Sequence, residues 1–280
     1  MKQTPISSLT PNSAEWVARA REGDKAALEA LVRAVQPQVY GLAIRMLWHP
    51  EDAKDATQDI LIRVVTHLAD YRGECAFSTW VYRIAANTLI SIRRGRIELQ
   101  GLTFERFGED LDRGLEDTIA SNDKSPDEVL LLEEVKLGCT LGMLLCLDRP
   151  HRLAYILGEI LDLDAPEAAQ ILEIASATFR KRLSRARTEI SRFMMAKCGL
   201  ANPDNPCRCR RRVNTAIQTG RIDPARLNFA TSTETARTFP ALLEEIRKLD
   251  NTRRAVALYR SHPQYRSGAD FAAMLSNLTT

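Results

Sequence analysis

The fold of this chain is decided by residues 50–94, which read PEDAKDATQDILIRVVTHLADYRGECAFSTWVYRIAANTLISIRR. Apolar positions in the first half recur at intervals of three and four, while acidic residues occupy another side, which predicts an amphipathic helix. The apolar stripe comprises Ala53, Ala56, Ile60, Val64 and His67. Pro50 suits the first turn of this helix. Ser78 predicts the N-cap of a second helix that continues to Arg94. We therefore expect two helices joined by a polar loop over residues 70–77.

The residues before this stretch extend the same helical domain. Residues 1–12 are expected to form a disordered tail, and Ser13 begins a short predicted helix that ends at Arg21. A longer apolar stripe follows between Leu28 and Met46, with Pro37 expected to interrupt or kink it. Together with the decisive stretch, these segments predict a compact helical domain over residues 13–96.

An acidic segment separates this domain from the next one. Between Glu98 and Glu134 there are twelve acidic residues against three basic ones, and no sustained apolar period appears before Val129. Such composition favours a solvated, flexible linker, which we assign to residues 97–124.

Residues 125–196 carry a helix-turn-helix pattern. Ser125 opens the domain with a capping box, and Asp164 and Glu167 repeat that box before a short helix. A tight turn begins at Glu173, and Ser176 is expected to cap a long helix in which six basic residues face one acid up to Arg192. Arginine reads guanine edges and neighbouring hydroxyl or basic groups hold phosphates, so this helix predicts DNA binding. The alternative is a solvated basic helix. The DNA-contacting candidates are Thr178, Arg180, Lys181, Ser184 and Arg185.

Two motifs in this order resemble the extracytoplasmic-function (ECF) sigma factors of bacterial RNA polymerase. The first is the D-A-x-D-A-x-Q-D block at residues 52–59 with F-S-T-W at residues 77–80, and the second is TFRKRLSRAR at residues 178–187. The chain departs from the family pattern at Glu173, where the family usually has glycine.

The resemblance implies roles for particular residues. Asp55, Gln58 and Asp59 are expected to grip the polymerase clamp, and the long basic helix to read the minus-thirty-five element. The loop over residues 70–77 is expected to hold a base extruded from the minus-ten region. The minus-ten contacts implied are Arg72, Ser78, Asn87, Arg93 and Arg94, with Arg96 beside them. The acidic linker would occupy polymerase channels otherwise used by nucleic acid, or serve only as a solvated connection.

Residues 197–280 extend beyond a minimal member of this family. They carry fourteen basic residues against seven acids, and weak helical signals predict a small helical domain, for which we expect a regulatory role. Cys198, Cys207 and Cys209, with His262 as a fourth ligand, could bind zinc or sense oxidation, although their spacing is not a standard zinc pattern. The alternative is that these cysteines only pack. Cys75, Cys139 and Cys146 are expected to be packing residues.

The sequence therefore predicts an all-α sigma factor with two modules and a C-terminal extension. Its partners would be core RNA polymerase and promoter DNA, with an anti-sigma protein as a further candidate. The formal net charge is +3, and no signal peptide or apolar segment of membrane-spanning length is present, so a cytoplasmic protein with no membrane partner is expected. The main rival is a helix-turn-helix regulator that acts without polymerase. No nucleophile, base and oxyanion donors gather in a catalytic pattern, so an enzyme is not expected.

Overall fold

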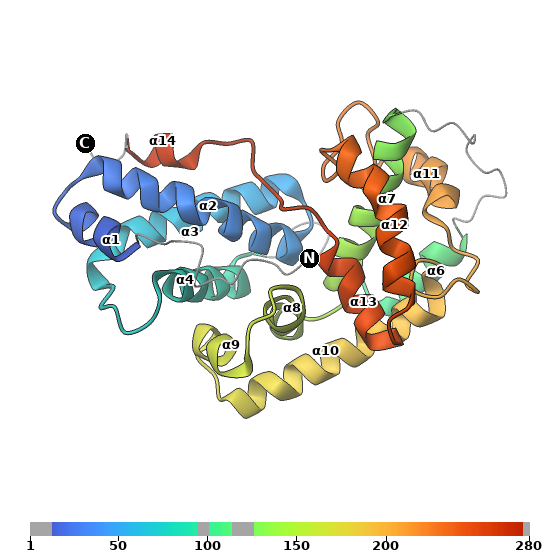
Figure 1. Cartoon of the computed structure of the whole chain (residues 1–280), viewed down its shortest axis with the longest axis horizontal. Helices are drawn as coiled ribbons and strands as arrows, with labels where there is room; N and C mark the ends of the chain where they lie inside the picture. Colours follow the sequence, from blue (N-terminus) through green and yellow to red (C-terminus); the bar gives the residue numbers. More distant parts are fainter. Residues whose placement is uncertain (1–12, 94–100, 114–125, 277–280) are drawn as a thin grey trace. The chain divides into compact units, whose positions relative to one another are not determined.

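A computed structural model of the chain describes residues 13–93, 101–113 and 126–276 (Figure 1). In these ranges the regular elements are helices, and the extended backbone pairs only in an isolated bridge between Asp223 and Arg226. This agrees with the all-α prediction. The chain packs as two compact units, which we name the α2 unit and the α7 unit after their central helices.

The α2 unit takes its described residues from three parts of the chain, 13–93, 149–183 and 264–276. Its helices are α1 (Ser13–Arg21), α2 (Lys25–Leu47), α3 (Pro50–Thr66), η2 (Leu68–Asp70), α4 (Phe77–Ser91), α8 (Arg149–Tyr155), η3 (Ile156–Ile160), α9 (Ala165–Leu172) and α14 (Phe271–Ser276). The first eight residues of α10 (Ser176–Lys197) also belong to it.

Helix α2 forms the centre of the α2 unit, and α1, α3, α4 and α14 all pack against it (Figure 1). Asp24 caps its start by accepting a hydrogen bond from the backbone N–H of Ala27 at 3.1 Å. The helix continues through Pro37 to Leu47, so the predicted interruption is absent. Every residue from Val39 to Leu47 is buried, because neighbouring helices cover several sides of α2.

Helix α9, the first helix of the predicted helix-turn-helix, packs against α4 within the α2 unit, to which the first eight residues of α10 also belong. Arg149, at the start of α8, donates to the backbone oxygens of Ile90 at 3.0 Å and Ile92 at 2.6 Å, which satisfies the carbonyls at the end of α4. The buried Arg152 donates to the backbone oxygen of Met46 at the end of α2. Two arginines of α8 therefore link this helix to the ends of α2 and α4, although the sequence predicted α8 to lie in a different module from α2 and α4.

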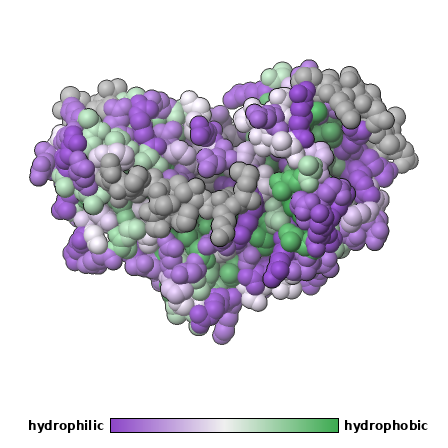
Figure 2. Space-filling model, in the orientation of Figure 1, coloured by the Kyte–Doolittle hydropathy of each residue, from purple (hydrophilic) through white to green (hydrophobic). Residues whose placement is uncertain are grey.

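The α7 unit comprises the described parts of residues 100–148 together with 184–263. Its helices are α6 (Phe104–Arg113), α7 (Pro126–Leu145), the remainder of α10, α11 (Cys209–Gln218), α12 (Thr233–Arg247) and α13 (Asn251–Arg260). Helix α7 packs against α11 and α12 (Figure 1). Figure 2 shows hydrophilic residues over the outward side of α12. The weak helical signals of the C-terminal extension thus correspond to α11, α12, α13 and α14.

A buried carboxylate on α7 organises the loop before α12. Glu134 accepts hydrogen bonds from three successive backbone N–H groups, those of Asn228 at 2.8 Å, Phe229 at 2.8 Å and Ala230 at 2.7 Å. Burial raises the pKa of Glu134, although these three donors favour its charged form. One side chain therefore accepts from three amide groups of a loop that is distant in sequence.

Three expectations about boundaries are wrong. Helix α6 lies inside the predicted flexible linker, and its Phe107 and Leu111 are buried. Helix α4 begins at Phe77 with Ala76 as its N-cap, so Ser78 lies inside the helix and is not the cap, and α4 ends at Ser91 instead of Arg94. His67 follows the end of α3 and is exposed, so it does not extend the apolar stripe.

Helix α6 is held by basic residues from the rest of the α7 unit. Asp110 accepts from Arg212 at 3.1 Å and from Arg221 at 2.6 Å, and its hydrogen bond to Arg221 lowers the pKa of Asp110. Lys197 of α10 lies 2.6 Å from Asp112. Part of the acidic segment therefore binds the basic extension within this one chain. The two compact units also differ from the predicted modules, since α7 belongs to the same unit as α11, α12 and α13 of the extension.

None of the described helices combines the length and the apolar content that crossing a bilayer requires.

Candidate functional site

The predicted polymerase-binding residues lie on the outer side of α3. Helix α3 buries Ala53, Ala56 and Ile60 against the α2 unit. Asp55 and Asp59, four residues apart, are exposed and Gln58 is half-buried. Residues at this spacing lie on neighbouring turns of one helix face, so the two carboxylates form an acidic surface that is accessible to a partner.

A groove lies between the end of α3 and one face of α4. It has a volume of about 330 Å³ and is lined by Arg63, His67, Asp70, Trp80, Ile84, Asn87, Thr88 and Ser91. The lining combines an indole ring with a guanidinium, a carboxylate, an amide and hydroxyl groups. This combination suits a planar ligand that carries hydrogen-bonding edges.

An aromatic cluster supports the wall of this groove. The ring centroids of Tyr71, Phe77 and Trp80 lie between 5.4 and 5.7 Å apart, with Phe77 buried and Trp80 half-buried at the groove. The Tyr71 hydroxyl donates to the backbone oxygen of Cys75 at 2.7 Å and closes the loop. Gly73 adopts φ of 76°, a left-handed conformation that glycine reaches without steric cost. Phe77 therefore packs, while Trp80 both packs and faces the groove.

The structure brings only part of the predicted minus-ten set to this groove. Asn87 lines it and is exposed, and its Nδ2 donates to Oε2 of Glu173 in the turn after α9 at 3.0 Å. Arg72 and Arg93 are exposed but are not among the lining residues, and Ser78 is buried with 1% exposure. A DNA contact by Ser78 would require this side chain to be uncovered.

Arg94 and Arg96 lie outside the described residues, as does Ser125 with its predicted capping box.

Most of the groove residues were not predicted from the sequence, although their spacing indicates that they share a helix face. Trp80, Ile84, Asn87 and Ser91 follow one another at four, three and four, so they share a single face of α4. Arg63 and His67 repeat the same interval at the end of α3. Their mixed polarity conceals this face from a search for apolar periodicity. A search for an alternating polar and aromatic face would have found it.

The predicted DNA-reading residues all lie on the surface of α10. Thr178, Arg180, Lys181, Ser184 and Arg185 are exposed, whereas Phe179, Ala186 and Ile190 on the opposite side are buried. Asp164 caps α9 by accepting from the N–H of Glu167 at 2.8 Å, as predicted. The turn that follows places Glu173 at φ of 52°, the left-handed conformation that glycine would adopt more easily. The chain therefore keeps the turn geometry despite its glutamate.

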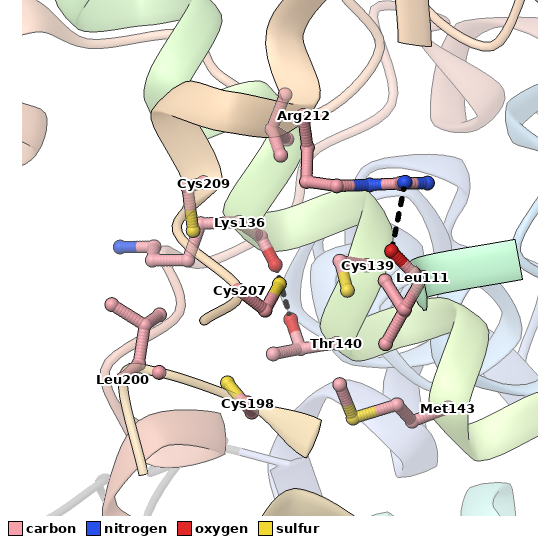
Figure 3. Close-up of a pocket in the computed structure, with 12 residues that line it drawn as sticks. Leu111, Lys136, Cys139, Thr140, Met143, Cys198, Leu200, Cys207, Cys209 and Arg212 are labelled. Carbon is pink, nitrogen blue, oxygen red and sulfur yellow. Dashed lines mark hydrogen bonds between the residues drawn. The ribbon is translucent and has the colours of Figure 1, made fainter. Parts of the chain in front are cut away.

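Four cysteines meet in the α7 unit around a small cavity of about 20 Å³. Cys139 comes from α7, Cys198 follows the end of α10, Cys207 lies in the next loop and Cys209 begins α11 (Figure 3). Burial raises the pKa of all four thiols, that of Cys207 to about 11. The backbone at Leu200 and Ala201 opposes this rise in the pKa of Cys198, and the backbone at Gly199 opposes it for Cys207. Cys139, predicted to be a packing residue, is thus a member of this cluster.

His262 is not among the residues that line this cavity. It is buried beside α7, where its Nε2 lies 2.9 Å from Oγ1 of Thr140.

The loop that carries these cysteines depends on a close backbone approach at Gly199. A Cβ atom at this position would overlap the backbone oxygen of Cys207 and the guanidinium of Arg208. We therefore expect Gly199→Ala to destabilise the α7 unit at the upper end of about 1–3 kcal/mol, because the backbone must move to admit the methyl group. Thermal and denaturant unfolding measure this effect. Gly268→Ala is the control, since nothing lies within 4 Å of its added Cβ, and equal stability of the two variants would contradict the prediction.

Comparison with known proteins agrees with this geometry. Residues 31–96 match the family Sigma-70 region 2. The chain is 30% identical over 182 residues to the RNA polymerase sigma-H factor of Pseudomonas aeruginosa, covering 92% of that protein and 64% of this chain. It is 31% identical over 180 residues to the ECF RNA polymerase sigma-E factor of Escherichia coli K12, covering 90% of that protein and 62% of this chain.

A third relative is the ECF RNA polymerase sigma factor SigE of Mycolicibacterium smegmatis, 31% identical over 178 residues, with 64% of that protein and 61% of this chain covered. The chain belongs to the family of ECF RNA polymerase sigma factors. Its function is to direct RNA polymerase to promoters, and the rival reading as a regulator that acts without polymerase is not favoured. Each of these three matches leaves more than a third of the chain uncovered.

Proposed function

We propose that this sigma factor divides promoter recognition among the three surfaces described above. Asp55, Gln58 and Asp59 on α3 bind core RNA polymerase, the groove between α3 and α4 holds an unstacked minus-ten base, and the exposed side of α10 reads the minus-thirty-five element. The observation that carries this proposal is the groove, because it joins a stacking surface to hydrogen-bonding groups. The same α2 unit also exposes the acidic face of α3.

The groove can favour the melted promoter by binding a base that has left the duplex. Stacking on an aromatic side chain contributes about 1–3 kcal/mol per base, which is comparable to the few kcal/mol that unstacking costs. Trp80 offers the ring, while Asn87 and Asp70 offer donors and acceptors for the base edge. Arg72 and the exposed Arg93 would then hold neighbouring phosphates. The proposed mechanism stabilises a conformation of DNA and needs no catalytic residue.

The basic side of α10 is suited to the major groove of the duplex. Arg180, Lys181 and Arg185 are exposed on a helix that begins directly after the turn, which is the position of a recognition helix. Arg185 lies 3.0 Å from Glu189 in the free chain, an exposed ion pair that DNA can replace at small cost. Thr178 and Ser184 add hydroxyl groups for phosphates or bases.

The partners follow from this assignment. Core RNA polymerase and promoter DNA are the two required ones, and the cytoplasm is the proposed location because polymerase and chromosome meet there. An anti-sigma protein as a further partner stays a prediction.

Transcription in vitro with core bacterial RNA polymerase and a randomised promoter library tests the proposed function. We expect initiation that depends on this protein and selects a bipartite sequence, which also identifies the promoter. A protein that binds DNA tightly and specifically alone, without initiation by core polymerase, would overturn it.

We further propose that the C-terminal extension acts in cis as part of the folded sigma factor. Its last segment packs on α2: Asp270 lies 3.0 Å from Arg33, and the Ala269 carbonyl accepts from Gln36 at 2.9 Å. The ring of Tyr265 lies under the guanidinium of Arg45, with 4.9 Å between the carbon and the ring centroid. Arg45 itself is buried, and burial lowers its pKa. The segment therefore covers a buried cation of the α2 unit.

Tyr265→Ala is expected to lower the free energy of unfolding by about 3–5 kcal/mol, because it removes a buried aromatic ring and a cation–π contact. Differential scanning calorimetry measures the change, and transcription at a temperature between the two midpoints shows whether activity follows. Gln264→Ala, at the exposed neighbouring position, serves as the control. If truncation after Ala196 leaves polymerase binding and transcription unchanged, the role of the extension in cis is wrong.

A further inference from the structure

We propose that Cys139, Cys198, Cys207 and Cys209 form a four-thiolate site for a zinc ion. The three cysteines of the extension alone lack the paired spacing of common zinc motifs, and the structure supplies a fourth from a distant helix. In such a site, one zinc ion would link the end of α10, the start of α11 and the middle of α7.

The four thiols surround a space of suitable size. They line a single cavity of about 20 Å³, which is sufficient for one small ion or one water molecule. Figure 3 shows their side chains projecting into the same region from α7, from the end of α10 and from the start of α11. No three described His, Cys, Asp or Glu side chains already have the spacing of a metal centre. Rotation about the Cα–Cβ bonds is therefore part of the proposal, since zinc–sulfur bonds are about 2.3 Å long.

Hydrogen bonds order the loop between Cys198 and Cys209, which carries three of the four cysteines. The side-chain amides of Asn202 and Asn205 donate to the backbone oxygen of Met195 at 3.2 and 3.0 Å, which caps the end of α10. Arg208 donates to the backbone oxygens of Pro203 at 2.7 Å and of Asn205. These contacts fix the backbone of the loop from which Cys198, Cys207 and Cys209 project.

Two buried cations lie beside the cavity of the proposed centre. One zinc ion with four thiolates leaves two net negative charges, which are costly to bury without compensation. Lys136 and Arg212 both line the cavity and are buried at 4% and 6% exposure. Lys136 also lies 2.7 Å from Glu133 and 3.4 Å from the ring centroid of Phe239. One ammonium and one guanidinium group therefore lie beside the proposed centre, and each is also paired with a carboxylate, Lys136 with Glu133 and Arg212 with Asp110.

The ligand chemistry selects zinc among common ions. Thiolates are soft donors, and a site of four sulfurs in tetrahedral arrangement is typical of structural zinc. His262 stays outside this site because it contacts Thr140. The alternative is that two of these thiols oxidise to a disulfide and sense redox conditions. The experiment below distinguishes this outcome from zinc binding.

The full-length protein, purified under reducing conditions, is analysed for metal by mass spectrometry and by reconstitution with Co²⁺. We expect about one zinc per chain, and for cobalt the intense sulfur-to-metal charge-transfer absorption of a tetrahedral four-thiolate site. Cys139→Ser is the decisive variant, because only the four-cysteine site requires this residue; it should lower the metal content at least fivefold. Cys146→Ser, directly after the end of α7 and outside the cavity lining, and Cys75→Ser should keep the metal.

A second measurement does not depend on the folding of any variant. Titration of the wild-type protein with a thiol-specific mercurial, in the presence of a coloured zinc indicator, should release zinc as four thiols react. Absence of zinc and of the cobalt spectrum, or full metal retention by Cys139→Ser, would overturn the proposal. A disulfide among these four cysteines, found by mass spectrometry in protein that binds no metal, would replace it with a redox role.

Discussion

Alanine in place of Asp55, Gln58 and Asp59 is expected to lower promoter-specific transcription by core polymerase at least hundredfold. Removing charged partners from a protein interface typically costs about 2–5 kcal/mol, and about 2.7 kcal/mol already corresponds to a hundredfold loss. The folded chain should tolerate the change, because Asp55 and Asp59 are exposed and surface substitutions usually alter stability by less than about 0.5 kcal/mol. Transcription and a pull-down with core polymerase measure the two effects separately.

The matched control removes carboxylates elsewhere on the same unit. Glu22→Ala with Glu51→Ala deletes two exposed acids, one before α2 and one in the first turn of α3. This control should bind polymerase normally, whereas Asp55→Ala with Asp59→Ala should not. If both pairs weaken binding equally, the effect is one of general charge and the assigned surface is wrong.

Alanine in place of Arg180, Lys181 and Arg185 is expected to lower the affinity of the holoenzyme for its promoter by roughly a hundred- to a thousandfold. Each bidentate contact to guanine contributes about 1–3 kcal/mol, and each lost phosphate contact reduces the salt slope of binding by about one. Fluorescence anisotropy over a range of salt concentrations, with the promoter selected from the library, measures both quantities.

Single substitutions on the same helix separate specific reading from net charge. Arg180→Ala and Arg192→Ala each remove one exposed cation from α10, about three turns apart. We expect Arg180→Ala to weaken promoter binding at least tenfold more than Arg192→Ala. Similar losses in the two variants would indicate that α10 acts only as a basic surface.

The sequence predicted those elements that have strong local signals. The apolar stripe of α3, the capped start of α9 and the basic face of α10 each depend on residues within about one helix length, and all three are present. Likewise, weak periodicity sufficed for the helices of the extension. The all-α fold and these two helix faces were therefore predictable from the sequence.

The failures concern contacts between distant residues. Helix α6 was missed because its few apolar residues lie among acids. Its Phe104 and Phe107 pack against Phe193 of α10, with ring centroids 5.1 and 5.7 Å apart. Cys139 looked isolated because its neighbours lie some sixty residues later in the chain. In the groove, Asp70 joins residues of α4 only through the packing of α3 on α4. Local helix propensity does not predict contacts between residues that are far apart in the sequence.

The interleaving of the two units restricts how this protein can be divided. Among the described residues, the chain passes from one unit to the other between residues 93 and 101, at 148 and 149, within α10 at 183 and 184, and at 263 and 264. A single cut therefore never yields a fragment that contains one whole unit and nothing of the other. Autonomous expression of the first module, a routine approach to modular regulators, would omit α8, α9 and α14 from its packing. Limited proteolysis should accordingly yield nicked chains that remain associated in place of separable domains.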